Sequence, residues 1–225
     1  MSKIIVAIDG PAASGKSTAA KKLAERLNFV YLDTGAMYRA ITYLALKNGL
    51  VDNENAIIEM TKNLDMSLKF EDGVTRVFVN GDEITEFIRT KEVNARVSDV
   101  SKIKDVRAEL VKIQKRLSEK GSLVAEGRDI TTVVFPDADV KIFMTASLDI
   151  RTDRRHKEFL AKGMDMTYEE VRENLINRDK LDSGREVSPL KKAEDAYELD
   201  TTDLSVGEEI EIMMDLINKL ESHRN

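Results

Sequence analysis

Residues 10–17 read Gly-Pro-Ala-Ala-Ser-Gly-Lys-Ser, a complete G-x-x-x-x-G-K-S pattern. The pattern follows the apolar run Ile4–Ile8 and precedes a stretch in which Ala20, Ala24 and Leu27 recur at helical spacing. Between a strand and a helix, the backbone N–H groups of such a loop surround phosphate oxygens. A chance glycine-rich turn is the alternative, and the coincidence of loop, strand and helix argues against it. We therefore predict that the chain binds a nucleotide and folds around this loop.

The residues of this loop have distinct expected roles. Lys16 can reach the β and γ phosphates of the nucleotide, and Ser17 can ligate Mg²⁺. Any metal should arrive with the nucleotide, because the chain has no cysteine and only two histidines. The predicted phosphate-binding residues are Gly10, Pro11, Ala12, Ala13, Ser14, Gly15, Lys16, Ser17 and Thr18.

Composition restricts the class of protein. The chain has 225 residues, 42% of them hydrophobic, which is enough to bury a substantial core. Its net charge of −6 argues against a polymeric nucleic acid as the main partner. No window approaches the roughly 18 consecutive apolar residues of a membrane span, and the N-terminus has no signal-peptide core. We expect a soluble, cytoplasmic protein without a membrane partner, and a monomer.

Apolar runs separated by helical patterns predict an α/β fold. Such runs indicate parallel strands covered on both faces, here a parallel five-stranded sheet. They lie at Ile4–Ile8, Phe29–Leu32, Leu123–Ala125, Val140–Met144 and Tyr197–Leu199. A capping box, Ser205 to Glu208, predicts the start of the last helix.

The segment from about 64 to 88 breaks this alternation. It reads as short strands separated by Asp72-Gly73 and Asn80-Gly81, which are strong signals for tight hairpins. We predict a small antiparallel sheet inserted on the flank of the domain, with a structural and a functional role equally open.

Polar residues follow two of the predicted strands, where ligands bind in open α/β sheets. The first group is Asp33-Thr34-Gly35-Ala36-Met37-Tyr38-Arg39, and the second is Gly127-Arg128-Asp129. Taken alone, Arg39 reads as a solvated helix residue, but the neighbouring phosphate loop favours a ligand-binding role. The second group favours a ligand-binding role by itself, because glycine at the end of a strand allows close approach of a ligand; a surface ion pair between Arg128 and Asp129 is the alternative.

Two later helices concentrate arginines. Arg151, Arg154 and Arg155 share one helical face, where like charges repel unless an anion joins them. A second helix, opened by the capping box Thr167 to Glu170, places Arg178, Asp182 and Arg185 along one stripe. Gly163 and Gly184 are plausible hinges, so residues 151–185 are predicted to form a lid; a solvated charged hairpin is the alternative.

These segments resemble those of bacterial cytidylate kinases, and the likeness extends along essentially the whole chain. It rests on Ile8-Asp9-Gly10-Pro11 with the phosphate loop, on residues 33–39, and on Glu126-Gly127-Arg128-Asp129-Ile130 continuing to residues 133–138. Members of the family often have glycine after Gly-Arg-Asp-Ile, where this chain has Thr131. The resemblance implies transfer of the γ-phosphoryl group of ATP to CMP or dCMP, with Mg²⁺ accompanying the ATP.

The resemblance also implies roles for individual residues. Arg39, Arg128 and Arg185 would hold the acceptor phosphate or bridge to the transferred group, and Arg178 and Asp182 would address the ribose. Ser98, Arg107 and Asp129 would read the cytosine, with Thr34 and Tyr38 lining the pocket. The lid arginines Arg151, Arg154 and Arg155 would close over the donor phosphates, and the catalytic set would be Lys16, Arg128, Arg154 and Arg185.

The implied organisation has three parts. The P-loop core would comprise residues 1–33, 101–150 and 186–225; residues 34–100 would form the monophosphate-binding region, and residues 151–185 the lid.

Two other functions compete with this interpretation. One is a P-loop kinase for UMP, AMP or a non-nucleotide acceptor. The other is a GTPase switch, which needs an N-K-x-D motif; the nearest match, Asn218-Lys219-Leu220-Glu221, ends in the wrong acid.

Overall fold

The computed structural model describes residues 3–71, 73–119 and 121–224, and its centre is a sheet of five parallel strands. The strands lie in the order β2-β6-β1-β7-β8, so that β1 is central and its carboxyl end is flanked by β6 and β7. This confirms the predicted α/β class. The strand bounds are β1 Ile5–Asp9, β2 Val30–Asp33, β6 Leu123–Gly127, β7 Val140–Thr145 and β8 Tyr197–Asp200.

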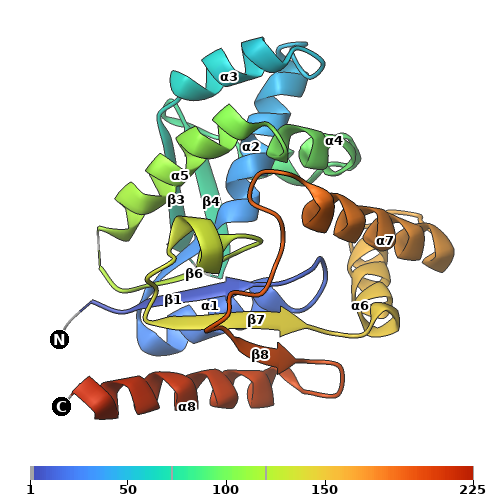
Figure 1. Ribbon diagram of the computed structural model, residues 1–225. Helices are drawn as coiled ribbons and strands as arrows, with labels where there is room; N and C mark the ends of the chain where they lie inside the picture. The colour runs from blue at the N-terminus through green and yellow to red at the C-terminus, as the bar shows by residue number, and fades with distance from the viewer. Residues whose placement is uncertain (1–2, 72, 120, 225) are drawn as a thin grey trace.

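Helices cover both faces of this sheet (Figure 1). On one face, α1 (Lys16–Leu27) and α8 (Val206–Arg224) bury apolar residues such as Leu23 and Met213 against the strands. On the other face lie α2 (Thr34–Lys47) and α5 (Lys104–Ser118). The predicted capping box opens α8: the Glu208 N–H donates to the Ser205 hydroxyl, and the Glu208 carboxylate accepts from the Ser205 N–H.

The predicted antiparallel insertion is also present. It consists of β3 (Met66–Glu71), β4 (Val74–Val79) and β5 (Asp82–Glu83), paired in that order; Asp72 lies outside the described residues. The insertion lies between α3 (Glu54–Lys62) and the short helices η1 (Phe87–Arg89) and α4 (Lys91–Ser101) in the chain. An edge contact between the rings of Phe70 and Tyr31, 5.0 Å between centroids, joins it to the main sheet.

A helical hairpin, α6 (Leu148–Ala161) and α7 (Tyr168–Gly184), projects from the carboxyl side of the sheet, at the right of Figure 1. Phe159, Val171 and Leu175 pack together with Ala12 of the phosphate loop. The predicted capping box of Thr167 and Glu170 opens α7. The arginines of both helices are thereby brought beside the loop.

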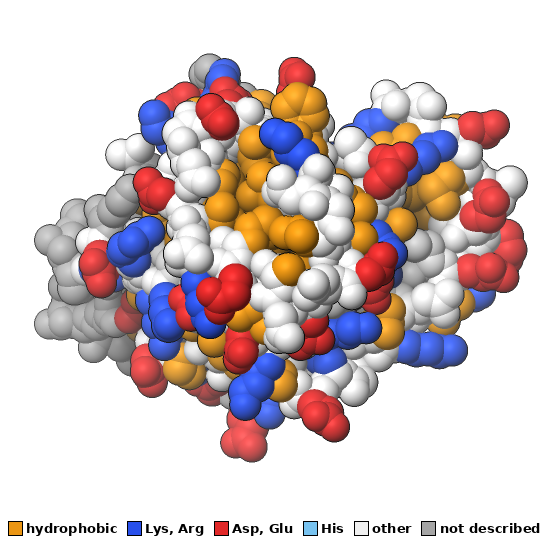
Figure 2. All heavy atoms as spheres, turned by 90° about the horizontal axis from the view of Figure 1, so that it is seen from above, with side chains coloured by type: hydrophobic (Ala, Val, Ile, Leu, Met, Phe, Trp, Pro, Cys, Tyr) orange, Lys and Arg blue, Asp and Glu red, His pale blue; other side chains and the backbone are white. Residues whose placement is uncertain are grey.

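The outer surface of the helices at the top of Figure 1 carries charges of both signs. Figure 2, which views this side from above, shows Lys and Arg side chains intermixed with Asp and Glu side chains around a group of hydrophobic ones. Among the residues that the structure describes, no helix combines the length and the apolar composition needed to cross a bilayer.

Candidate active site

The phosphate loop runs from the end of β1 to the start of α1. Its first glycine, Gly10, has φ of 152°, and a Cβ at this position would lie 1.9 Å from the carbonyl oxygen of Met144 in β7. Gly15, with φ of 95°, is the N-cap of α1. The close approach to β7 and the left-handed turn into the helix together fix the loop against the sheet edge.

Replacing Gly10 with Ala is expected to lower the free energy of unfolding by about 3 kcal/mol, because the new Cβ would overlap a backbone carbonyl that cannot move away. The measurement is urea-induced unfolding followed by circular dichroism. Gly49→Ala is the matched control: Gly49 also has a positive φ, but nothing lies within 4 Å of its Cβ position, so it should lose only about 1 kcal/mol. Equal losses in the two variants would contradict the packing argument.

Lys16 lies folded over its own loop. Its Nζ donates to the carbonyl oxygen of Pro11 at 2.7 Å and to the Ser14 hydroxyl at 3.3 Å. Burial, and then the neighbouring Arg128 guanidinium, lower the pKa of the Lys16 amine to about 7. A phosphate at this position would reverse the shift, because it supplies the negative charge that the buried amine lacks.

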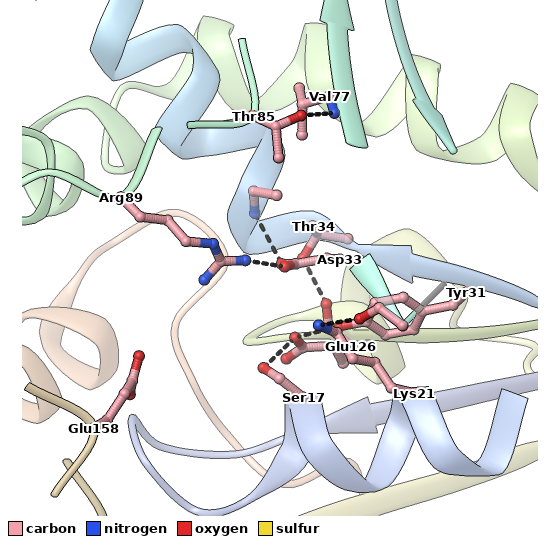
Figure 3. Close-up of polar contacts among 12 residues, drawn as sticks. Ser17, Lys21, Tyr31, Asp33, Thr34, Val77, Thr85, Arg89, Glu126 and Glu158 are labelled. Atoms are coloured by element: carbon pink, nitrogen blue, oxygen red, sulfur yellow. Dashed lines mark hydrogen bonds and ion pairs between the residues drawn. The ribbon is translucent and has the colours of Figure 1, made fainter. Parts of the chain in front are cut away.

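Ser17 points at an acid to which the sequence had assigned no role. Its hydroxyl donates to Oε1 of Glu126 at 2.5 Å, and the Tyr31 hydroxyl donates to the same oxygen at 3.1 Å (Figure 3). Glu126 lies at the end of β6 and pairs in register with Ile8 of β1. The sequence could have indicated Glu126 as a site residue, because it stands at the end of a predicted strand, directly before Gly127-Arg128-Asp129.

Arg107 and Asp129 form a buried pair at one end of the cleft. Arg107 Nη2 donates to Asp129 Oδ2 at 2.5 Å, and Nη1 donates to the Ser101 carbonyl at 2.8 Å. The guanidinium lies 5.1 Å from the ring centroid of Tyr38. Both charged side chains are only 3–4% exposed. A guanidinium donor and a carboxylate acceptor are thus held side by side, as recognition of a polar base edge requires.

One carboxylate forms ion pairs with two arginines in the middle of the cleft. Asp182 of α7 accepts from Nε of Arg128 at 2.8 Å, and its other oxygen lies 3.7 Å from Nη1 of Arg185. Burial opposes ionisation of Asp182, but Arg128 and the other arginines keep its pKa below the usual value. Because two cations share one anion, the middle of the cleft has an excess of positive charge.

Two further arginines in the cleft have no acidic partner. Among the described residues, the guanidinium groups of Arg39 and Arg178 form neither a hydrogen bond nor an ion pair; each side chain is partly exposed, but its Nε atom is buried. Burial, reinforced by neighbouring guanidinium groups, lowers the pKa of Arg39 to about 10 and that of Arg178 to about 9. Removing water from a charge that has no ion-pair partner is costly. An anion bound between these side chains would compensate them.

The three arginines of α6 have different surroundings. Arg151 is pinned by the Ala12 carbonyl at 3.2 Å and by Asp179 at 2.7 Å. Arg154 donates to the carbonyl oxygens of Ser14 and Thr201 at 3.3 and 2.8 Å. Arg155 pairs with Glu158 of its own helix at 2.8 Å. Arg154 and Arg155 line the cleft, whereas Arg151 is not among the residues that line it.

Most of these groups border one cavity of about 830 Å³ at the carboxyl edge of the sheet. Of the predicted phosphate-loop residues, Gly10 and Pro11 do not line it. The other predicted residues, Arg151 excepted, line it: Ala12, Ala13, Ser14, Gly15, Lys16, Ser17, Thr18, Thr34, Tyr38, Arg39, Ser98, Arg107, Arg128, Asp129, Arg154, Arg155, Arg178, Asp182 and Arg185.

The antiparallel insertion also contributes to this cavity, through Val74, Thr75 and Thr85. Lys21 of α1 donates to the Gly73 carbonyl at 3.2 Å, which joins the tip of the hairpin to the helix that follows the phosphate loop. Figure 3 shows Arg89, which follows the insertion in the chain, reaching to Asp33 at 3.0 Å. The sequence analysis predicted no site residue in the insertion, because the sequence does not show which part of the fold the insertion packs against.

Comparisons with known proteins identify the family to which this chain is similar. A family model described as cytidylate kinase matches residues 6–219. The chain is 52% identical over 217 residues to a cytidylate kinase of Bacillus cereus, and 52% identical over 216 residues to one of Bacillus anthracis, covering 96% of each chain.

Solved structures share the fold at low sequence identity. An uncharacterized protein from Eubacterium ventriosum aligns with a TM-score of 0.53 at 16% identity, covering 97% of this chain and 99% of that one. A shikimate kinase from Bacteroides thetaiotaomicron aligns with a TM-score of 0.50 at 9% identity, covering 96% and 99%.

Proposed function

The chain belongs to the cytidylate kinase family and phosphorylates CMP, and on that premise we propose how its cleft accomplishes the reaction. ATP binds with its β and γ phosphates in the loop that contains Lys16, and CMP or dCMP binds from the other side with its base beside Asp129. The two phosphate groups meet among the arginines. The observation that carries this proposal is the pair of cleft guanidinium groups of Arg39 and Arg178, whose buried Nε atoms have no partner among the described residues.

The base end of the cleft supports a cytosine acceptor. Cytosine presents an amino donor where uracil presents a carbonyl acceptor. The carboxylate of Asp129 attracts the amino group and repels the carbonyl, while Arg107 holds that carboxylate in place. Ser98, Thr34 and Tyr38 line the same cavity and would complete the pocket.

The middle of the cleft supports phosphoryl transfer. The transition state spreads negative charge over the phosphoryl oxygens and needs little acid or base assistance. Lys16, Arg39, Arg128 and Arg185 would stabilise that charge by position, and Arg178 with Asp182 would orient the ribose. No general base is assigned.

Ser17 and Glu126 fit the Mg²⁺ that accompanies ATP. Both offer oxygen atoms, which Mg²⁺ prefers, and they lie 2.5 Å apart at the first turn of α1. The ion, when bound, would neutralise phosphate charge between the two substrates. Ser17 would be its direct ligand, and Glu126 would orient that hydroxyl.

We further propose that residues 151–185, which comprise most of α6 and all of α7, act as a lid, and that residues 34–100 bind the monophosphate. Arg154 and Arg155 would turn toward the donor phosphates on closure, while Arg151 would keep the base of the lid on the loop. Closure would exclude water, which would otherwise accept the phosphoryl group.

The test is a coupled assay of ADP release with CMP, dCMP, UMP and AMP as acceptors. We expect rapid turnover with CMP and dCMP and slower turnover with UMP, because Asp129 selects an amino donor where uracil has a carbonyl. AMP, whose base also carries an amino donor, tests whether the pocket accepts a purine. ATP or GTP hydrolysis without an acceptor would instead indicate a switch. Preference for UMP or AMP would indicate a kinase for another acceptor.

A further inference from the structure

The carboxylate of Asp9 is fully buried at the end of β1, directly before the phosphate loop. It accepts three hydrogen bonds: from the Ile130 N–H at 2.8 Å, from the Thr131 N–H at 2.7 Å and from the Thr131 hydroxyl at 2.7 Å. All three donors belong to the π-helical turn η2 (Ile130–Val134) that follows Asp129. One buried acid therefore joins the phosphate loop to the segment that carries the base-reading residue.

The hydroxyl of Thr131 makes one of these bonds, and only a serine or threonine offers it in this arrangement. A glycine at this position would leave Asp9 with two backbone donors. Thr131 itself is only 1% exposed and does not line the cleft, so it has no direct route to a substrate. Its contact with Asp9 therefore acts on the backbone of the turn, and through that backbone on Asp129 and its partner Arg107.

We propose that Asp9 and Thr131 are positioning residues for base recognition, which hold the Asp129 carboxylate in register with the phosphate loop. The inference rests on the proposed role of Asp129 in reading cytosine. It gives Thr131, which does not line the cleft, a part in substrate selection. The contact also ties the acceptor base pocket to the strand that leads into the donor site.

The bonds to Asp9 are strongest when its carboxyl group is ionised. Burial raises the pKa of Asp9 to about 6, and the Thr131 hydroxyl is the largest opposing influence, followed by the two N–H groups. The charged groups facing Asp9 are Lys16 of α1 and Asp129. The neighbouring strands place Gly127 and Phe143 beside it, and neither titrates. Below the pKa, a protonated Asp9 holds the turn less firmly.

The experiment compares Thr131→Val with Thr131→Ser and Thr132→Val. Valine keeps the shape of threonine and removes the hydroxyl, serine keeps the hydroxyl, and Thr132 is the matched control because its buried hydroxyl has no partner among the described residues. Steady-state kinetics would give KM for CMP, KM for ATP and the CMP/UMP ratio of kcat/KM. Carbon-detected NMR titration of the Asp9 carboxyl would report its pKa without any need for turnover.

We expect Thr131→Val to raise KM for CMP about tenfold and to lower the CMP/UMP ratio, with KM for ATP nearly unchanged. The pKa of Asp9 should rise above about 6, and the acid limb of kcat/KM for CMP should move to higher pH with it. The phosphate of CMP also titrates near pH 6, but equally for every variant, so the difference reports the protein. Thr131→Ser and Thr132→Val should behave like the wild type.

The inference fails if Thr131→Val matches Thr132→Val in KM for CMP, in CMP/UMP ratio and in the titration of Asp9. It also fails if KM for ATP and KM for CMP rise together, since that result indicates general loosening of the fold. If the wild type itself shows no preference for CMP, the base-reading role of Asp129 is wrong, which is a different outcome. If Thr131→Val folds poorly, the NMR titration of the Asp9 carboxyl is made on Thr131→Gly instead. An Asp9 pKa equal to that of the wild type would then overturn the inference.

Discussion

Replacing Lys16 with Met is expected to lower kcat at saturating CMP and ATP about a thousandfold. Methionine is nearly as long as lysine and keeps the packing of its stem, so the change removes mainly the charge. Nζ is held among phosphate-loop oxygens, 2.7 Å from the Pro11 carbonyl oxygen, and a bound phosphate would keep the buried amine protonated. An amine that is already in position needs no reorganisation when the transition state forms.

The measurement is rapid-quench single-turnover kinetics, which separates the chemical step from product release. Lys22→Met is the matched control, since Lys22 lies on the exposed side of the same helix and should keep nearly full activity. The loss should be the same with CMP, dCMP and UMP, because Lys16 is expected to contact the donor rather than the acceptor. Retention of wild-type turnover would mean that the phosphate loop serves some other ligand.

The strands and caps of this protein could be predicted because their signals are local. The apolar run Ile4–Ile8 and the capping box at Ser205 depend on residues within one turn or strand of each other. The insertion was predictable for the same reason, since Asn80-Gly81 marks a tight turn between β4 and β5. The tertiary structure did not override these local preferences, because each of these segments has a sequence pattern that suits its place beside the sheet.

The roles of Glu126 and Asp9 could not be predicted, because they arise from strand order. Ser17 meets Glu126 across 109 positions of sequence, and Asp9 meets Thr131 across 122. Both contacts exist because β6 pairs with β1 in one particular register. A linear pattern shows that strands are present but does not say which of them are neighbours, so it places polar residues at the sheet edge without pairing them.

The arginines of α6 show a second limit of sequence reasoning. Helical spacing places Arg151, Arg154 and Arg155 on one face, and an anion is one way to relieve their repulsion. In the structure, protein acceptors already relieve part of it, because Arg151 bonds to Ala12 and Asp179, and Arg154 to the carbonyls of Ser14 and Thr201. Spacing along a helix gives the direction of a side chain but not the acceptors that another segment brings to it.

Replacing Asp129 with Asn is expected to lower the CMP/UMP ratio of kcat/KM about a hundredfold. The amide keeps the size of the carboxyl group and can still accept from Arg107, so the buried contact at 2.5 Å is weakened and not abolished. It loses the negative charge that we propose repels the uracil carbonyl, and it gains an N–H that can donate to that carbonyl. The ratio should therefore fall through both a slower reaction with CMP and a faster one with UMP.

Steady-state kinetics with both acceptors at saturating ATP would measure this change. KM for ATP, measured at saturating CMP, should stay within about twofold of the wild type, because the donor phosphates are proposed to bind at Lys16, on the far side of the arginines. Asp137→Asn, an exposed position in the loop before β7, is the control for removal of one negative charge. The decisive comparison is between the acceptors. Equal losses with CMP and UMP, or an equal rise in KM for ATP, would assign Asp129 to the architecture of the cleft, since a carboxylate that reads the base must distinguish an amino group from a carbonyl.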